Sequence, residues 1–285
     1  MKIFSASLKT LLVLLVLFQN CFAQEQIKED ALDASKTPIK IGAKIGYSLG
    51  KLSNSSTNVY TEDYESVSGI DWGFTAEFGL SKIFSIQTEI NFTQRGGIRN
   101  GMQPVTGNEL SDQLNAFLPF IGLPEITNTN PLYAEFENES DLKYLEFPVL
   151  AKFGWGDDFR LYGEAGAYVG ILLCSTQHTS GSSQFYFDEE GANPVFVPIS
   201  NNLTEFVELP TQSLNAETNT EDDLKTVNFG GIVGIGVAKK LGDKSEIYFD
   251  ARASYGFNSI QIKNEFGESH IGGVIFSLGY AYSIQ

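Results

Sequence analysis

The sequence predicts an all-β protein: an eight-stranded antiparallel up-and-down transmembrane β-barrel with long extracellular loops and short periplasmic turns. Three observations predict this fold. The chain begins with an export signal, eight later segments alternate between apolar and polar residues, and the connections between these segments are by turns short and long. The composition agrees, because 13% aromatic residues and 28 Gly favour strands and close backbone packing over helical bundles.

Residues 1–23 are expected to form a secretory signal peptide that is removed after export. Two lysines precede an apolar run over residues 11–18, and small residues stand before a cut ahead of Gln24. A membrane anchor is the alternative, but the run is shorter than the roughly 20 residues that a spanning helix needs. We therefore expect residues 24–38 to form a periplasmic N-terminal segment and residues 39–285 to form a barrel domain in the bacterial outer membrane.

Eight segments have the period-two alternation that is typical of a strand with two different faces. In the first, Ile41, Ala43 and Ile45 alternate with Gly42 and Lys44. No segment after the signal reaches the length of a transmembrane helix, so a closed barrel is the structure that would pair every backbone group within a membrane. The expected strands cover residues 39–49, 70–80, 84–93, 144–153, 159–171, 227–237, 246–257 and 272–283.

The connections between these strands alternate in length. Those after the second, fourth and sixth strands are a few residues long, whereas the others run through residues 52–68, 96–140, 174–224 and 259–269. In outer-membrane barrels the short turns face the periplasm and the long loops face outward. The chain has 35 acidic and 19 basic residues, and the acidic excess lies in these expected outer loops. Such a surface repels a phosphate backbone, which excludes nucleic acid as a partner.

Several strand segments resemble a known family. The stretch Leu-Lys-Tyr-Leu-Glu-Phe-Pro-Val-Leu-Ala-Lys at 142–152, the stretch Tyr-Gly-Glu-Ala-Gly-Ala-Tyr-Val-Gly at 162–170 and the shorter segments 41–46 and 86–90 resemble the PorT-like, porin-family outer-membrane β-barrel proteins of Bacteroidota. The resemblance covers the strands and not the loops. It implies an outer-membrane barrel and a link to secretion and surface-protein export. The chain departs from the pattern at Gln285, where an aromatic residue is usual.

The polar face of the expected strands collects charged residues inside the barrel. An eight-stranded barrel is about filled by side chains, so these residues are expected to form ion pairs rather than to line a wide channel. Lys40, Asp71 and Arg95 share this face. The predicted barrel-interior charge network consists of Lys44, Glu77, Glu89, Glu146, Lys152, Arg160, Glu164, Asp250 and Arg252.

No catalytic, cofactor or metal site is predicted. Glu146 and Glu164 lie on adjacent strands and could share a proton, but Lys152, Arg160 and Arg252 are available to neutralise them. His178 and His270 have no second histidine or cysteine at ligand spacing. The position two residues after His270 is Gly272, so the serine of lipid A deacylases is missing.

Two further patterns are expected to have structural roles rather than to bind a ligand. The glycine-rich segment 230–236 lies within a strand and no helix follows it, so it is expected to make room for large side chains rather than to bind phosphate. The loop acids at 188–190 and 221–223 are expected to form a solvated anionic surface rather than a calcium site, because they lack the ligand spacing of a calcium loop.

One loop segment is unusually apolar. In residues 111–124, Ser111 could cap a short helix that Pro119 ends. Its apolar residues need a cover, which the barrel mouth, residues 195–197 or a protein partner could supply. Self-packing is the default expectation. The candidate residues for contact with a partner are Phe117, Leu118, Phe120 and Ile121.

These features predict a non-enzymatic protein, a structural or accessory component of the cell envelope. Its expected partners are outer-membrane lipid and an envelope protein that contacts the outer loops. A narrow porin or uptake accessory is the first alternative. The second is a secreted lipocalin-like ligand-binding barrel, which requires the opposite arrangement, with apolar residues inside and polar residues outside.

Overall fold

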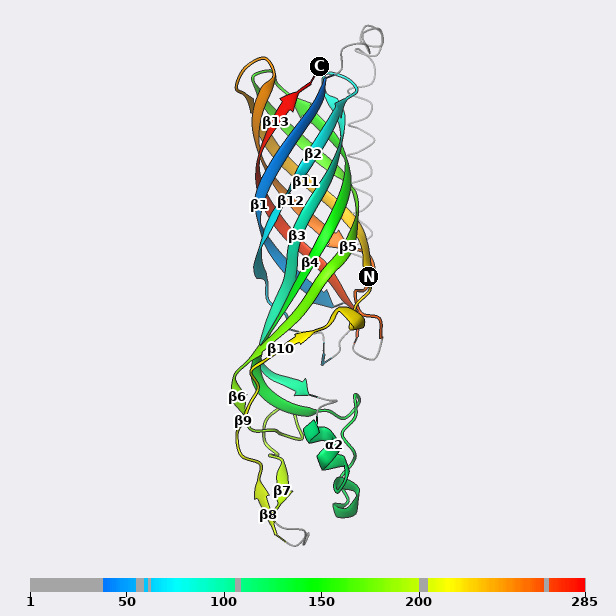
Figure 1. The fold of residues 1–285 in the computed structure, drawn as a ribbon, viewed down its shortest axis with the longest axis vertical. Coiled ribbons are helices and arrows are strands. Elements are labelled where there is room, and N and C mark those ends of the chain that lie inside the picture. Colours follow the sequence, from blue (N-terminus) through cyan, green and yellow to red (C-terminus); the bar gives the residue numbers. More distant parts are fainter. Residues whose placement is uncertain are drawn as a thin grey trace, which may run out of the picture.

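The computed structural model describes residues 38–54, 59–60, 63–105, 109–199, 205–263 and 267–284. The expected signal peptide and residues 24–37 lie outside the described residues. Eight long antiparallel strands close into a ring in the order β1, β2, β3, β4, β5, β11, β12, β13, and β13 pairs with β1 (Figure 1). The strands are β1 (Ile39–Asn54), β2 (Val67–Gly79), β3 (Phe84–Val105), β4 (Leu132–Trp155), β5 (Phe159–Ser180), β11 (Val227–Lys240), β12 (Ser245–Gly256) and β13 (Ser269–Ser283). The prediction of an eight-stranded antiparallel barrel is confirmed.

The two faces of the barrel wall differ sharply in polarity. On β1 the side chains of Ile41 and Ile45 are exposed on the outside, whereas those of Lys44 and Ser48 are buried inside. The same division holds along the other strands of the ring, because successive side chains of a strand point to opposite faces. An apolar outer surface and a polar interior are typical of a membrane barrel and opposite to the polarity of a lipocalin-like barrel.

Three strands extend far beyond the ranges that the sequence pattern predicted, and most of the others are longer by a few residues. β3 continues to Val105 and β4 starts at Leu132, so much of the expected loop 96–140 is a paired β-ribbon. β5 continues to Ser180, and within the expected loop 174–224 it pairs with β10 (Ala216–Asn219). The ribbon keeps the period-two alternation, but on the outer face of β4 acidic residues replace the apolar ones. Beyond a membrane that face meets water, so no apolar signal marks the strand.

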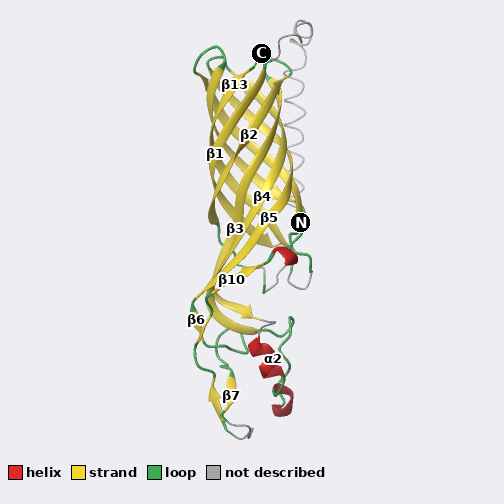
Figure 2. Cartoon of the chain, viewed as in Figure 1, coloured by secondary structure: helices red, strands yellow, loops and turns green. Residues whose placement is uncertain are grey.

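The extended strands support a separate folded unit at the end of the barrel with the long connections, here called the head (residues 102–135 and 182–215). Figure 2 shows its helices beside short strands, well away from the barrel. It contains α2 (Glu109–Asn115), the 3-10 helix η3 (Leu118–Ile121), β6 (Ser182–Ser183), β7 (Phe196–Pro198), β8 (Phe206–Glu208) and β9 (Gln212–Ser213). A further 3-10 helix, η4 (Glu221–Asp223), follows β10. Within the described residues, no helix has both the length and the apolar character needed to cross a membrane.

The head has its own hydrophobic core, which contains residues from the second and third long connections. Its central members are fully or almost fully buried, and residues such as Phe117, Phe136 and Phe187 pack against them. The helix differs from the expectation: α2 starts before Ser111, whose side chain is buried, so Ser111 does not cap it. Pro119 lies in the first turn of η3, where its missing N–H has no helical partner to lose, and does not end the helix. The core residues are Leu114, Leu118, Ile126, Leu132, Ala134, Phe185 and Val195.

Candidate functional site

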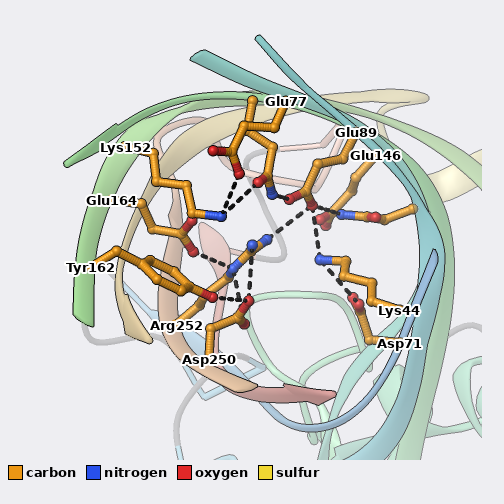
Figure 3. Close-up of polar contacts among 12 residues, drawn as sticks. Lys44, Asp71, Glu77, Glu89, Glu146, Lys152, Tyr162, Glu164, Asp250 and Arg252 are labelled. Atoms are coloured by element: carbon orange, nitrogen blue, oxygen red, sulfur yellow. Dashed lines mark hydrogen bonds and ion pairs between the residues drawn. The ribbon is translucent and has the colours of Figure 1, made fainter. Parts of the chain in front are cut away.

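Arg252 lies at the centre of the barrel interior. Its Nε lies 2.6 Å from Glu164 Oε1 and 3.1 Å from Asp250 Oδ1, and its Nη1 donates to Glu89 Oε2 at 2.9 Å. Figure 3 shows the guanidinium pointing into this group of carboxylates, which come from strands on different sides of the ring. The hydroxyl of Tyr162 also donates to Asp250, at 3.3 Å. One cation therefore joins β3, β5 and β12 across the lumen.

Glu89 links Arg252 to a second group of charges. Lys44 Nζ lies 2.8 Å from Glu89 Oε2 and 3.7 Å from Asp71 Oδ1. Arg95 Nη2 in turn lies 3.9 Å from Asp71 Oδ2 and 3.5 Å from a carboxylate oxygen of Glu146. The network thus continues from β12 through β3 and β1 to β2 and β4.

A third group lies around Lys152. Its Nζ donates to Glu77 Oε2 at 3.0 Å and to Gln87 Oε1 at 2.9 Å, and it stands 4.1 Å from the centre of the Tyr162 ring. Arg160 Nη1 lies 3.6 Å from the other oxygen of Glu77. A buried charge is stable only when it is paired and hydrogen-bonded, and here each cation has at least one carboxylate.

The structure brings all nine residues of the expected network into the lumen. Eight are buried, and Arg160 is half-buried near the end of the barrel with the short turns. Lys40, from the same face of β1, pairs with Glu246 at 2.7 Å, and Glu246 was missed by the sequence analysis. The sequence contains the pattern that would identify it, because Glu246 follows the same alternation as Asp250. Asp71 and Arg95 also belong to the network, although the expected set did not include them.

Pairs of tyrosine and glycine fill much of the remaining lumen. Tyr162 stands opposite Gly236 on the neighbouring strand, and Tyr248 stands opposite Gly279. A Cβ atom at either glycine would collide with the tyrosine ring, so only glycine leaves room there. The glycine-rich segment 230–236 therefore serves packing: Tyr168 lies against Gly230 in the same way.

A hydrophobic cluster covers the charge network at the end of the barrel with the long connections. It includes Leu52 of β1, Leu142 and Tyr144 of β4, and Ile271 of β13, all of which are buried. A cavity of about 260 Å³ opens above it, and its wall includes Tyr64 and residues of the fourth long connection. The lumen below this cavity is occupied by ion pairs of both signs, whereas a selective pore usually has a ring of one sign.

The candidate partner residues divide into two kinds. Leu118 is 0% exposed at the centre of the head core, and Phe117 packs against that core. Phe120 is 80% exposed and Ile121 is 38% exposed on the same short helix. Leu118 and Phe117 therefore pack within the head, whereas Phe120 and Ile121 lie at its surface.

The remaining candidates have local partners. His178 lies 3.9 Å from the exposed carboxylate of Glu217, and His270 stacks on Tyr255 at the barrel rim. Asp188 accepts hydrogen bonds from the backbone N–H groups of Ala192 and Asn193 within its own loop. In the part of the chain that the structure describes, no three His, Cys, Asp or Glu residues converge as metal ligands would.

Sequence comparison identifies the family of this barrel. Residues 22–261 match a family model described as outer membrane protein beta-barrel domain. The chain belongs to this family. The outer-membrane bilayer therefore surrounds the apolar outer face of the barrel, and outer-membrane lipid is its partner there. No curated protein sequence matches the chain.

Solved outer-membrane proteins are similar in structure at low sequence identity. The outer membrane protease OmpT of Escherichia coli has a TM-score of 0.40 and 10% identity, over 87% of this chain and 97% of that one. OprG of Pseudomonas aeruginosa has a TM-score of 0.39 and 8% identity, over 87% and 96% of the two chains. Neisserial surface protein A has a TM-score of 0.36 and 9% identity, over 86% and 97%.

Proposed function

We propose that this protein is a non-enzymatic structural or accessory component of the cell envelope, in which a closed barrel anchors a protein-binding head outside the outer membrane. The orientation follows from the general rule for outer-membrane barrels, whose short turns face the periplasm. Both described ends of the chain lie at the end with the short turns, opposite the head (Figure 1).

One observation carries the proposal: the strands that form the barrel wall continue beyond it to support the head, while the lumen beneath is filled. β3 and β4 stay paired from Phe84 with Phe153 to Val105 with Leu132. In the lumen, Glu77, Glu89 and Glu164 each have a basic partner within 3.6 Å. A carboxylate held in an ion pair is a poor general acid or base, which supports a non-enzymatic role.

The surface of the head supports contact with a protein partner. Apolar side chains are exposed at its far end, on η3 and on the β7–β8 hairpin, where Phe120, Ile199 and Val207 are 80%, 62% and 48% exposed. The head contains nine acidic residues and no Lys or Arg. Apolar anchors within an acidic surface are complementary to a partner that presents apolar residues among basic ones. The resemblance to PorT-like proteins supports a partner in secretion or surface-protein export.

The first test is co-purification of the tagged protein from native outer membranes in mild detergent. We expect stoichiometric association with a partner, and loss of that association in the double variant Phe120→Asp with Val207→Asp. The matched control is Thr211→Asp, which adds a charge at an exposed polar position of the head. A barrel that migrates alone, or equal loss in the control, would overturn the binding role.

The second test addresses the lumen. We expect no discrete conductance steps when the purified barrel is reconstituted in planar bilayers, because the ion pairs and tyrosines occupy the path. The alternative of a narrow porin requires regular conductance steps in the intact protein. Such steps would show that the barrel conducts ions, which would favour a transport role over an anchoring role.

A further inference from the structure

The outer wall of the barrel contains a hollow that the function proposed above does not use. Its volume is about 540 Å³, within the range of about 300–1,000 Å³ that is usual for small-molecule sites. It lies across β4, β5, β11 and β12, on the face that contacts lipid, and nearly all of its lining is apolar. A hollow on this face is filled by the hydrocarbon of the membrane, so its shape decides how a lipid chain packs there.

The register of the strands explains the hollow. Trp155, Leu161, Val237 and Phe249 stand side by side in one row across the four strands. In the next row toward the middle of the membrane, the small residues Gly163 and Ala251 flank Ile235, which is 71% exposed. A Cβ atom at Gly163 would meet one atom within 4 Å, at 3.9 Å, so this position is open. Large side chains thus border two small positions, with the side chain of Ile235 between them.

A basic residue lies at the edge of the same hollow. Lys239 is two residues beyond Val237 on the same face of β11, which places it about 7 Å nearer the short turns. It is exposed, and its neighbours in the row are Phe159 and Ile247. Among the described residues, no ion pair within 4.0 Å involves Lys239. Its long side chain can reach the headgroup region while its stem lies along the apolar wall.

We propose that this hollow binds one glycerophospholipid of the periplasmic leaflet, with its two acyl chains on either side of Ile235, over Gly163 and Ala251, and its phosphate at Lys239. The length and direction match, because the basic group lies at the headgroup level and the hollow extends from it toward the middle of the membrane. Trp155, exposed at the end of β4, is the kind of residue that anchors a barrel at this interface.

The test is native mass spectrometry of the full mature protein, titrated with phosphatidylglycerol and with diacylglycerol of the same chains. We expect the wild type to retain one phosphatidylglycerol. Filling the hollow with Gly163→Leu should weaken retention of both lipids about tenfold, which corresponds to about 1.4 kcal/mol. Lys239→Gln should weaken retention of phosphatidylglycerol about fivefold and leave retention of diacylglycerol unchanged.

Two matched controls separate a specific site from ordinary lipid contact. Ala43→Leu enlarges an outward residue on β1, away from the hollow, and Lys240→Gln removes the neighbouring charge, on the opposite face of β11. Both should retain phosphatidylglycerol like the wild type. Each variant is folded if its unheated sample migrates faster in an SDS gel than its heated, unfolded sample. Equal loss in variants and controls would mean non-selective lipid contact, and unchanged binding in Lys239→Gln would exclude the phosphate contact; either result overturns the proposal.

Discussion

The barrel and the head of this protein have opposite architectures in one continuous set of strands. In the barrel, charged residues such as Arg252 and Glu89 are buried and apolar residues cover the outside. In the head, Leu118 and Leu132 are buried, and the surface carries acidic residues together with a few exposed apolar ones. The difference teaches that the surroundings of each region, lipid or water, decide which residues its interior can hold.

Strand β4 shows the change within a single element. Its buried face is continuous from Leu132 to Lys152, but its outer face carries Glu135, Glu137 and Glu139 beyond the membrane and apolar residues from Leu145 onward. The pairing of β4 with β5 shifts by one residue between Lys143 and Tyr144, close to this change. The β-bulge therefore marks the boundary between the two regions.

The largest effect is expected from removing the central cation of the barrel. Arg252→Met leaves Glu89, Glu164 and Asp250 without their main partner, and breaking a buried pair in this way costs about 3–5 kcal/mol. Unfolding of the barrel by urea in detergent micelles measures the loss. The control is Lys143→Met on the outer face of β4, where the side chains of the ion pair Lys143 and Asp141 are 39% and 15% exposed; its loss should cost about 0–1 kcal/mol. Equal losses would refute the view that the network stabilises the barrel.

The next largest effect is expected in the core of the head, without a change in the stability of the barrel. Leu118→Ala should destabilise the head by about 2–5 kcal/mol, because the side chain is 0% exposed in the head core. Limited proteolysis should then cleave the head while the heat-dependent gel migration of the barrel stays unchanged. Phe120→Ala, two residues away but exposed, is the control and should change neither. If Leu118→Ala lowered barrel stability as much as head stability, the two regions would form one cooperative unit.

A smaller effect is expected from the glycine pockets of the barrel. Gly236→Ala forces a methyl group against the Tyr162 ring, and overpacking of this kind costs about 1–3 kcal/mol. The same urea titration measures it. Gly242→Ala, in the turn between β11 and β12, has open space around the added methyl group and should be nearly neutral. A neutral result at Gly236 would show that the tyrosine can move and that the lumen is less tightly filled.

The smallest effect concerns pH and the surface of the head. The backbone N–H groups of Ala192 and Asn193 donate to the Asp188 carboxylate and hold its pKa below the usual value of 3.8. A lowered pKa stabilises the folded loop above pH 3.8, and this contribution is lost as the pH falls through the pKa of the folded state. The protection of the backbone amides of residues 188–193 against hydrogen exchange, relative to their intrinsic rates at each pH, should therefore fall at low pH. Asp188→Asn should remove most of this pH dependence, and an unchanged pH profile would contradict the assignment.

The expected strands and the inner face of the barrel could be predicted because each strand obeys a local rule. Alternation in residues such as Phe74, Glu77 and Phe78 shows which side chains share a face, and the ring then brings the polar face inward. The extension of β3 to Val105 could not be predicted in this way. Beyond the membrane the outer face of β3 carries polar residues and Gly, and that of β4 carries acids, all of which are also common in loops.

The order of residues along the chain determined the eight strands, their alternating faces, the acidic long connections and the candidate charges of the lumen. Only the tertiary structure decided which cation meets which carboxylate, that Leu118 is buried while Phe120 is exposed, and that Gly163 leaves a hollow in the lipid face. The physical reason is that alternation is a property of neighbours in one strand. Ion pairs, a shared core and a hollow depend on the register between strands that are far apart in the sequence.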